Sequence, residues 1–232
     1  MEDSCLAIIP ARGASKGIPR KNIISVNGAP LISYTIGAAL ASSRVSRVIV
    51  SSENEEVLDI SESCGADIIK RPLELAGDDS SADAVIFHCL DTLKTEENFI
   101  PESFVLLQAT SPLRTYRHID EAIKLFIENS SQAVVSVFES TNHPLKSFKV
   151  DERGFITGLI SNEYILTPRQ QLPKAYIPNG AIFIIKTEAF RKHRTLLPPE
   201  TLPYFMSKSD SVDVDDMNDL DYVAFLMKKR NS

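Results

Sequence analysis

Short, largely apolar runs alternate with amphipathic stretches along this chain, and that alternation constrains its fold more than any other feature. The runs occupy residues 6–10, 47–52, 104–108 and 133–138. Unbroken hydrophobic runs of this length are typical of strands that are covered on both faces. Strands that alternate with helices predict an α/β fold, with a mainly parallel mixed sheet and helices on both of its faces.

Three stretches between these runs have helical patterns. Residues 30–43 place apolar side chains at helical spacing behind a proline, which suits a first helical turn. Residues 54–65 begin with a capping asparagine and early acids and end with a glycine. Residues 118–130 are amphipathic. We therefore expect three helices that pack against the sheet.

The pattern changes after about Glu139. Short alternating segments surround a turn signal at residues 151–154, which predicts a small antiparallel hairpin. A buried strand follows from Tyr176, and residues 211–230 indicate a strand, an acidic turn and a closing helix. We expect a single domain over residues 1–232 with a small antiparallel excursion at about 140–178.

Composition limits the class of partner. The formal net charge is -6, which gives no general attraction to nucleic acid or to an anionic membrane. No segment approaches the roughly 18 apolar residues of a membrane span. The first residues carry acids where a secretory signal would carry bases, and the three cysteines are far apart in sequence. A cytoplasmic protein with no nucleic-acid or membrane partner is the expectation.

A basic loop follows the first predicted strand, where open α/β sheets usually bind phosphate. Gly13 and Gly17 permit positive φ angles and close approach of a ligand to the backbone, and Ser15 adds a donor. The loop's cations are Arg12, Lys16, Arg20 and Lys21. Their mutual repulsion favours a polyanionic ligand such as a triphosphate. The alternative is a solvated basic turn that is paired with nearby acids.

Two familiar phosphate loops do not fit these residues. A P-loop needs Gly-Lys-Ser/Thr four residues after its first glycine, whereas Ile18 stands there after Gly13. The dinucleotide-binding fingerprint also fails, because three residues separate Gly13 from Gly17 and no third glycine follows in phase. Neither a P-loop ATPase nor a Rossmann dehydrogenase is indicated.

An acidic segment lies near the end of the chain. Asp213 and Asp215 are two residues apart on a predicted strand, so both side chains are expected on one face. Two converging carboxylates repel each other unless a cation lies between them, and Mg²⁺ favours carboxylates together with phosphate oxygens. The alternative is that they only complement the start of the last helix.

Four segments together resemble the CMP-sialic acid synthetases, cytidylyltransferases that activate nine-carbon 2-keto sugar acids. They are "IIPARGASKGIPRKNI", "LLQATSPLR", "PNGAIFI" and "SVDVDD". The resemblance implies a fold of the nucleotide-diphospho-sugar transferase type, a homodimer in which the excursion serves dimerisation, CTP as a substrate, and Mg²⁺. One departure is Ala14, where the family more often has glycine; alanine fits there only if its φ angle is negative.

The resemblance also assigns roles to individual residues. The catalytic candidates are Lys21, for leaving-group stabilisation, with Arg12, Asp213 and Asp215. The nucleotide-binding candidates are Arg12, Gly13, Ser15, Lys16, Lys21, Asn22 and Arg71, and the guanidinium of Arg71 suits either a base edge or a phosphate. The sugar-acid candidates are Gln108, Thr110, Ser111, Lys146 and Arg169. The metal ligands are Asp213 and Asp215.

The expected reaction transfers CMP from CTP to a nonulosonic acid and releases pyrophosphate. Three alternatives stay open: a cytidylyltransferase for the eight-carbon acid Kdo, a metal-dependent glycosyltransferase that uses its Asp-x-Asp motif, and a non-catalytic nucleotide-binding module. None of the four histidines is a convincing general base.

Overall fold

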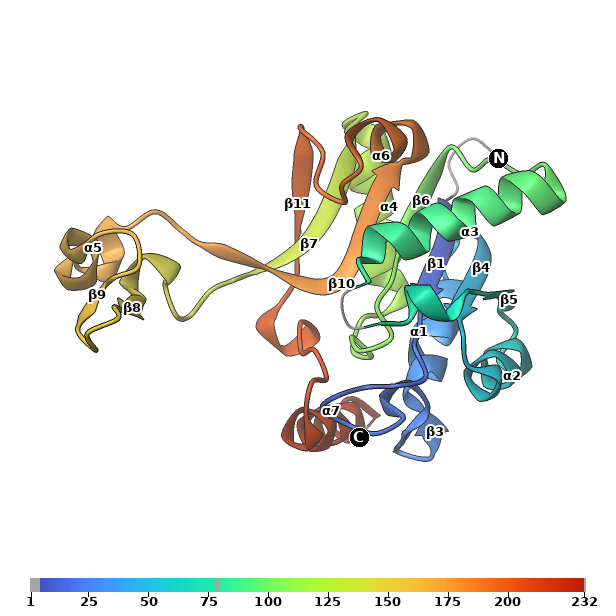
Figure 1. Ribbon diagram of the computed structural model, residues 1–232, viewed down its shortest axis with the longest axis horizontal. Coiled ribbons are helices and arrows are strands. Elements are labelled where there is room, and N and C mark those ends of the chain that lie inside the picture. The colour runs from blue at the N-terminus through green and yellow to red at the C-terminus, as the bar shows by residue number, and fades with distance from the viewer. Residues whose placement is uncertain (1–4, 78–79, 232) are drawn as a thin grey trace.

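A mixed sheet forms the centre of the molecule in a computed structural model that describes residues 5–77 and 80–231 (Figure 1). Its seven described strands lie in the order β11-β7-β10-β6-β1-β4-β5. β1 pairs in parallel with β4 and β6, whereas β10 is antiparallel to both of its neighbours. The strands are β1 (Cys5–Pro10), β4 (Val45–Ser52), β5 (Asp67–Lys70), β6 (Ser103–Leu106), β7 (Ala133–Glu139), β10 (Tyr176–Lys186) and β11 (Thr201–Phe205). The predicted fold class is confirmed.

Helices cover both faces of this sheet, which explains the unbroken apolar runs. Ala7 and Ile9 of β1 face one core with α1 and α4, whereas Leu6 and Ile8 face another core with α3 and α6. Because adjacent strand residues point to opposite faces, each strand needs apolar side chains on both. The helices are α1 (Leu31–Leu40), α2 (Glu55–Ser63), α3 (Ala82–Glu97), α4 (Tyr116–Glu128), α6 (Thr187–His193) and α7 (Met217–Asn231).

The predicted helix signals match the structure closely. Asn54 caps α2 by accepting a hydrogen bond from the Val57 amide at 3.1 Å, and Gly65 follows the helix with a φ angle of 91°. α4 begins two residues earlier than expected, because Thr115 and His118 form its cap. No bounds were predicted from the sequence for helix α3, which Ser81 caps by accepting a hydrogen bond from the Ala84 amide.

An arm projects from the body between β7 and β10 (Figure 1). It contains β8 (Phe148–Val150), β9 (Ile156–Gly158) and the short helix α5 (Asn162–Leu166). β8 and β9 pair antiparallel around the predicted turn, where the Asp151 amide donates to the Phe155 carbonyl at 2.9 Å. The expected hairpin is therefore present, carried well away from the sheet.

The acidic segment differs from the prediction. Residues 211–216 are not a strand but an irregular connection from the 3₁₀ turn at Lys208–Asp210 to α7. The amide of Val214 donates to the carbonyl of Thr110 at 2.9 Å, so the segment is attached to the loop after β6 without forming a strand ladder. The prediction that Asp213 and Asp215 lie on one face of a strand was therefore wrong, because these residues do not form a strand.

The described helices include none that is long and apolar enough to cross a membrane. The first four residues, on which part of the expectation about a secretory signal depends, lie outside the described part of the chain.

Candidate active site

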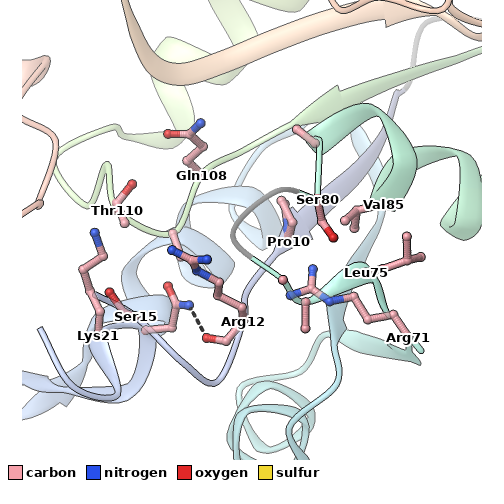
Figure 2. A pocket seen from close by; sticks show the side chains of 15 residues that line it. Pro10, Arg12, Ser15, Lys21, Arg71, Leu75, Ser80, Val85, Gln108 and Thr110 are labelled. Atoms are coloured by element: carbon pink, nitrogen blue, oxygen red, sulfur yellow. Dashed lines mark hydrogen bonds between the residues drawn. The ribbon is translucent and has the colours of Figure 1, made fainter. Parts of the chain in front are cut away.

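A pocket of about 340 Å³ opens where the basic loop, the end of β5 and the loop after β6 meet (Figure 2). Its position at the carboxyl ends of β1, β5 and β6 is where open α/β sheets bind ligands. One wall consists of apolar or small residues, including Leu75, Ala76 and Val85. The sequence-predicted residues that line the pocket are Arg12, Ser15, Lys21, Asn22, Arg71, Gln108 and Thr110.

Internal contacts hold the basic loop in shape. Asn22 is buried and donates a hydrogen bond to the carbonyl of Arg12 at 2.8 Å. Gly13 and Gly17 permit positive φ angles but do not adopt them, and neither does Ala14. These glycines instead allow neighbouring residues to pack closely against the backbone of the loop. A Cβ atom on Gly13 would come within 2.6 Å of Asn54, and one on Gly17 would come within 2.3 Å of the Asp215 carbonyl oxygen.

Lys21 connects the basic loop to the acidic segment. Its ammonium group donates to the carbonyl of Val214 at 2.8 Å and lies 3.3 Å from Oδ1 of Asp215. The Lys21 side chain is only 15% exposed, whereas that of Asp215 is 78% exposed. The predicted loop cation and the predicted metal carboxylate are thus neighbours.

Asp213 carries a buried carboxylate that is only partly hydrogen-bonded. Its Oδ1 is buried and has no hydrogen-bond partner among the described residues. Burial raises the pKa of its carboxyl, a hydrogen bond from Thr110 lowers it, and the charge of Asp215 raises it again. Within residues 5–77 and 80–231, no group of three or more metal-binding side chains occurs. Two carboxylates suit Mg²⁺ if a bound phosphate and water complete its coordination.

Arg71 is held by a carboxylate that the sequence reasoning missed. Glu53 follows β4, and its Oε2 accepts hydrogen bonds from Nε and Nη2 of Arg71 at 3.1 and 2.8 Å. Its Oε1 accepts from the amide of Gly13 at 2.7 Å. An acidic residue directly after a buried strand was the signal available in the sequence.

The loop after β6 rests on a second buried arginine. Arg114 donates to the carbonyl of Gln108 at 2.9 Å, to the hydroxyl of Thr35 and to the carbonyl of Ala181. Burial lowers its pKa to about 9. Gly180, with a φ angle of 72°, lets the Gln108 side chain approach, since a Cβ there would lie 2.4 Å from Oε1. Arg114 belongs to the "SPLR" motif but was not predicted to have a role.

Seven predicted residues do not line the pocket: Asp213 and Asp215, described above, and five others. Gly13 donates its amide to Glu53, and Lys16 lies exposed on the loop. Ser111 is fully buried, with no hydrogen-bond partner for its hydroxyl in the described chain. Lys146 and Arg169 lie in the arm, where they donate to the carbonyls of Ile165 and Ser140. Direct ligand contact by these five stays a prediction.

A family model of cytidylyltransferases matches residues 6–153, more than half of the chain. The chain is a member of the cytidylyltransferase family. An N-acylneuraminate cytidylyltransferase of Escherichia coli is 38% identical to it over the whole chain and 54% of that relative. A pseudaminic acid cytidylyltransferase of Campylobacter jejuni is 31% identical over 96% of each chain. This cytidylyltransferase thus spans about half the length of the first relative and nearly all of the second.

Solved structures support the same fold. A CMP:2-keto-3-deoxy-manno-octonic acid synthetase complexed with CTP has a TM-score of 0.72 and 16% identity, covering 98% of this cytidylyltransferase and 99% of the other chain. A 4-diphosphocytidyl-2C-methyl-D-erythritol synthase from Anaerococcus prevotii has a TM-score of 0.65 and 11% identity over 98% and 97% of the two chains. At these identities the likeness concerns fold alone.

Proposed function

We propose that this cytidylyltransferase transfers CMP from CTP to a nine-carbon 2-keto sugar acid and releases pyrophosphate. The observation that carries the proposal is the convergence of Lys21 and Asp215 beside a pocket that Arg12 and Arg71 also line. The names of the two relatives, which act on N-acylneuraminate and pseudaminic acid, favour a nonulosonic acid as the acceptor. Since CTP is a cytosolic nucleotide, we place the reaction in the cytoplasm.

The two ends of the pocket suit the two ends of CTP. Arg12, Ser15 and Lys21 offer cations and donors at one end, where the triphosphate belongs. Arg71 lies at the other end, beside Leu75 of the apolar wall (Figure 2), and its charge is already balanced by Glu53. A neutralised donor beside apolar side chains suits a planar base better than a phosphate, so we assign Arg71 to the cytosine edge.

The reaction needs positioning and charge neutralisation more than covalent chemistry. The oxygen of the sugar acid's anomeric hydroxyl attacks the α-phosphorus and loses its proton to solvent. The bond from the α-phosphorus to the bridging oxygen breaks, and pyrophosphate leaves with the electron pair. Lys21 and Arg12 stabilise the negative charge that develops on the leaving group. Lys21 is suited to this because its contacts with Val214 and Asp215 hold its side chain in place.

Asp213 and Asp215 would hold Mg²⁺. When bound, the ion supplies Lewis-acid neutralisation of phosphate oxygens. The unpartnered Oδ1 of Asp213 fits this role, because a buried carboxylate oxygen without a hydrogen bond is unfavourable unless a cation approaches it. Thr110 orients the Asp213 carboxylate from the loop after β6, and the Val214 amide keeps that loop attached to the acidic segment.

The arm favours a homodimer. It exposes seven large apolar side chains, Phe148, Val150, Phe155, Ile156, Leu159, Ile160 and Leu166. An exposed apolar group of this size on a projecting element marks an interaction surface. A second copy of the chain is the occupant we propose, and the arm that projects from the body (Figure 1) would carry Lys146 and Arg169 toward the sugar acid bound by that copy.

Pyrophosphate release from CTP tests the proposal directly. The assay compares N-acetylneuraminic, legionaminic and pseudaminic acids with Kdo, each with and without Mg²⁺. We expect Mg²⁺-dependent release with at least one nine-carbon acid. Turnover with Kdo alone would contradict the substrate class, and CTP binding without release for any acid would indicate a non-catalytic module.

A further inference from the structure

Both carboxylate oxygens of Glu53 accept hydrogen bonds from other residues of the protein. Its Oε2 accepts from Arg71 at 2.8 Å and its Oε1 accepts from the Gly13 amide at 2.7 Å. The side chains of Glu53 and Arg71 are 9% and 3% exposed. Glu53 therefore joins the end of β5 to the basic loop through one buried carboxylate whose two oxygens both accept hydrogen bonds.

A buried carboxylate beside a triphosphate site requires a physical reason, because it repels the ligand. The pairing with Arg71 supplies that reason. Nε and Nη2 of Arg71 are directed at Glu53, and Figure 2 shows the guanidinium group turned toward the pocket. Glu53 thus fixes the direction of a side chain that otherwise has several rotatable bonds, and leaves the remaining donors to the ligand.

Fixed donors discriminate between pyrimidines. The ring N3 and O2 of cytosine are both acceptors, whereas N3 of uracil carries a hydrogen and donates. An arginine presents donors only. A guanidinium held in one orientation against this edge accepts cytosine and meets uracil with donor against donor, which leaves buried polar groups unpaired.

We propose that Glu53 is a positioning residue that sets the preference for CTP over UTP by orienting Arg71. The inference rests on the proposed function, and in particular on cytosine lying against Arg71. Glu53 acts through Arg71 and through the Gly13 amide, and it does not line the pocket itself.

Glutamine cannot replace Glu53 in this role. Its amide has one accepting oxygen, so its NH₂ group must face either the Gly13 amide or the Arg71 guanidinium, both of which are donors. Aspartate keeps the charge but is one methylene shorter, so it cannot reach both partners at once. A purely electrostatic role would tolerate aspartate, and a geometric role does not.

The test measures equilibrium binding of CTP and UTP to the full chain by calorimetry in the presence of Mg²⁺. We expect Glu53→Gln and Glu53→Asp each to reduce the CTP preference of the wild-type protein by about tenfold. The matched control is Glu55→Gln, because Glu55 pairs with Lys70, the neighbour of Arg71, and both side chains are exposed. This control should keep the wild-type ratio.

Retention of the wild-type ratio by both Glu53 variants would overturn the inference, and so would an equal loss in Glu55→Gln. If Glu53→Gln does not fold, Glu53→Asp decides, since it keeps a negative charge near Arg71. A wild-type protein with no preference for CTP would overturn the proposed function itself, and the inference with it.

Discussion

Gly17 lies against the backbone of Asp215, so closely that an added Cβ would come within 2.3 Å of the Asp215 carbonyl oxygen. The basic loop and the acidic segment therefore meet backbone to backbone although they are far apart in sequence. Lys21 reinforces the contact through the neighbouring carbonyl of Val214. This arrangement places the proposed triphosphate-binding cation Lys21 beside the candidate metal carboxylate Asp215.

Gly17→Ala should separate these two segments. The clash is with backbone, which cannot rotate away, so we expect pyrophosphate release to fall by more than about tenfold and the free energy of unfolding by about 1–3 kcal/mol. Steady-state kinetics and urea unfolding measure the two effects. Gly37→Ala is the control, because nothing lies within 4 Å of its added Cβ. Equal activity in the two variants would contradict the packing.

Lys21→Met should lower kcat by about 100-fold or more, with a smaller change in KM for CTP, because the lost charge stabilises the leaving group more than the ground state. Initial rates at saturating sugar acid measure both constants. Lys70→Met removes an exposed lysine that pairs with Glu55 and does not line the pocket, and it should leave the rates near those of the wild type. A change confined to KM would show that Lys21 only binds CTP.

Asp213→Asn should stabilise the metal-free protein by about 1 kcal/mol, since it removes a carboxylate with an unpartnered buried oxygen near Asp215. It should also abolish the rise in melting temperature that Mg²⁺ with CTP produces. Thermal unfolding with and without the ligands measures both. The control is Asp221→Asn, the same change of charge on the exposed side of α7. A full ligand-induced shift in Asp213→Asn would contradict the metal assignment.

Leu166→Asp should weaken the proposed dimer. Leu166 is 87% exposed in the single chain, and loss of one buried leucine contact corresponds to about 2 kcal/mol, or roughly 30-fold in the dimer dissociation constant. Light scattering across a dilution series measures the mass. Leu197→Asp changes an exposed leucine outside the arm and should leave the mass unchanged. A wild-type monomer at all concentrations would refute the dimer.

His118→Gln should reduce the acid sensitivity of the fold. Nδ1 of His118 accepts a hydrogen bond from the Thr115 amide, and burial lowers the pKa of this histidine although Asp210 opposes the shift. As the pH falls, the histidine is therefore protonated first in the unfolded chain, below a pH of about 6.5. The free energy of unfolding decreases from that pH down to the lower pKa of the folded protein.

Glutamine caps without titrating. Between pH 7.5 and 5.5, we expect the wild type to lose about 1 kcal/mol more unfolding free energy than His118→Gln. Urea unfolding at the two pH values provides the comparison. Parallel losses in the two proteins would show that His118 is not responsible.

Local patterns predicted most of the fold. The run at residues 6–10 became β1 because both of its faces are covered, and Asn54 caps α2 as its side-chain chemistry requires. The strand expected at residues 211–216 failed, since no neighbouring strand pairs with it and its amide at Val214 bonds to a loop instead. Apolar residues that alternate with acidic ones, as at residues 211–216, form a strand only when the edge of another strand is available for pairing.

The sequence by itself determined the α/β class, the basic loop, the acidic pair and the family, because each depends on residue types close together in the chain. Tertiary structure alone decided that Gly17 packs on Asp215, that Glu53 binds Arg71, and that Lys146 and Arg169 lie in an arm away from the pocket. Such contacts join residues from distant segments. Their distances depend on how the strands pair and where loops leave the sheet, which no local pattern encodes.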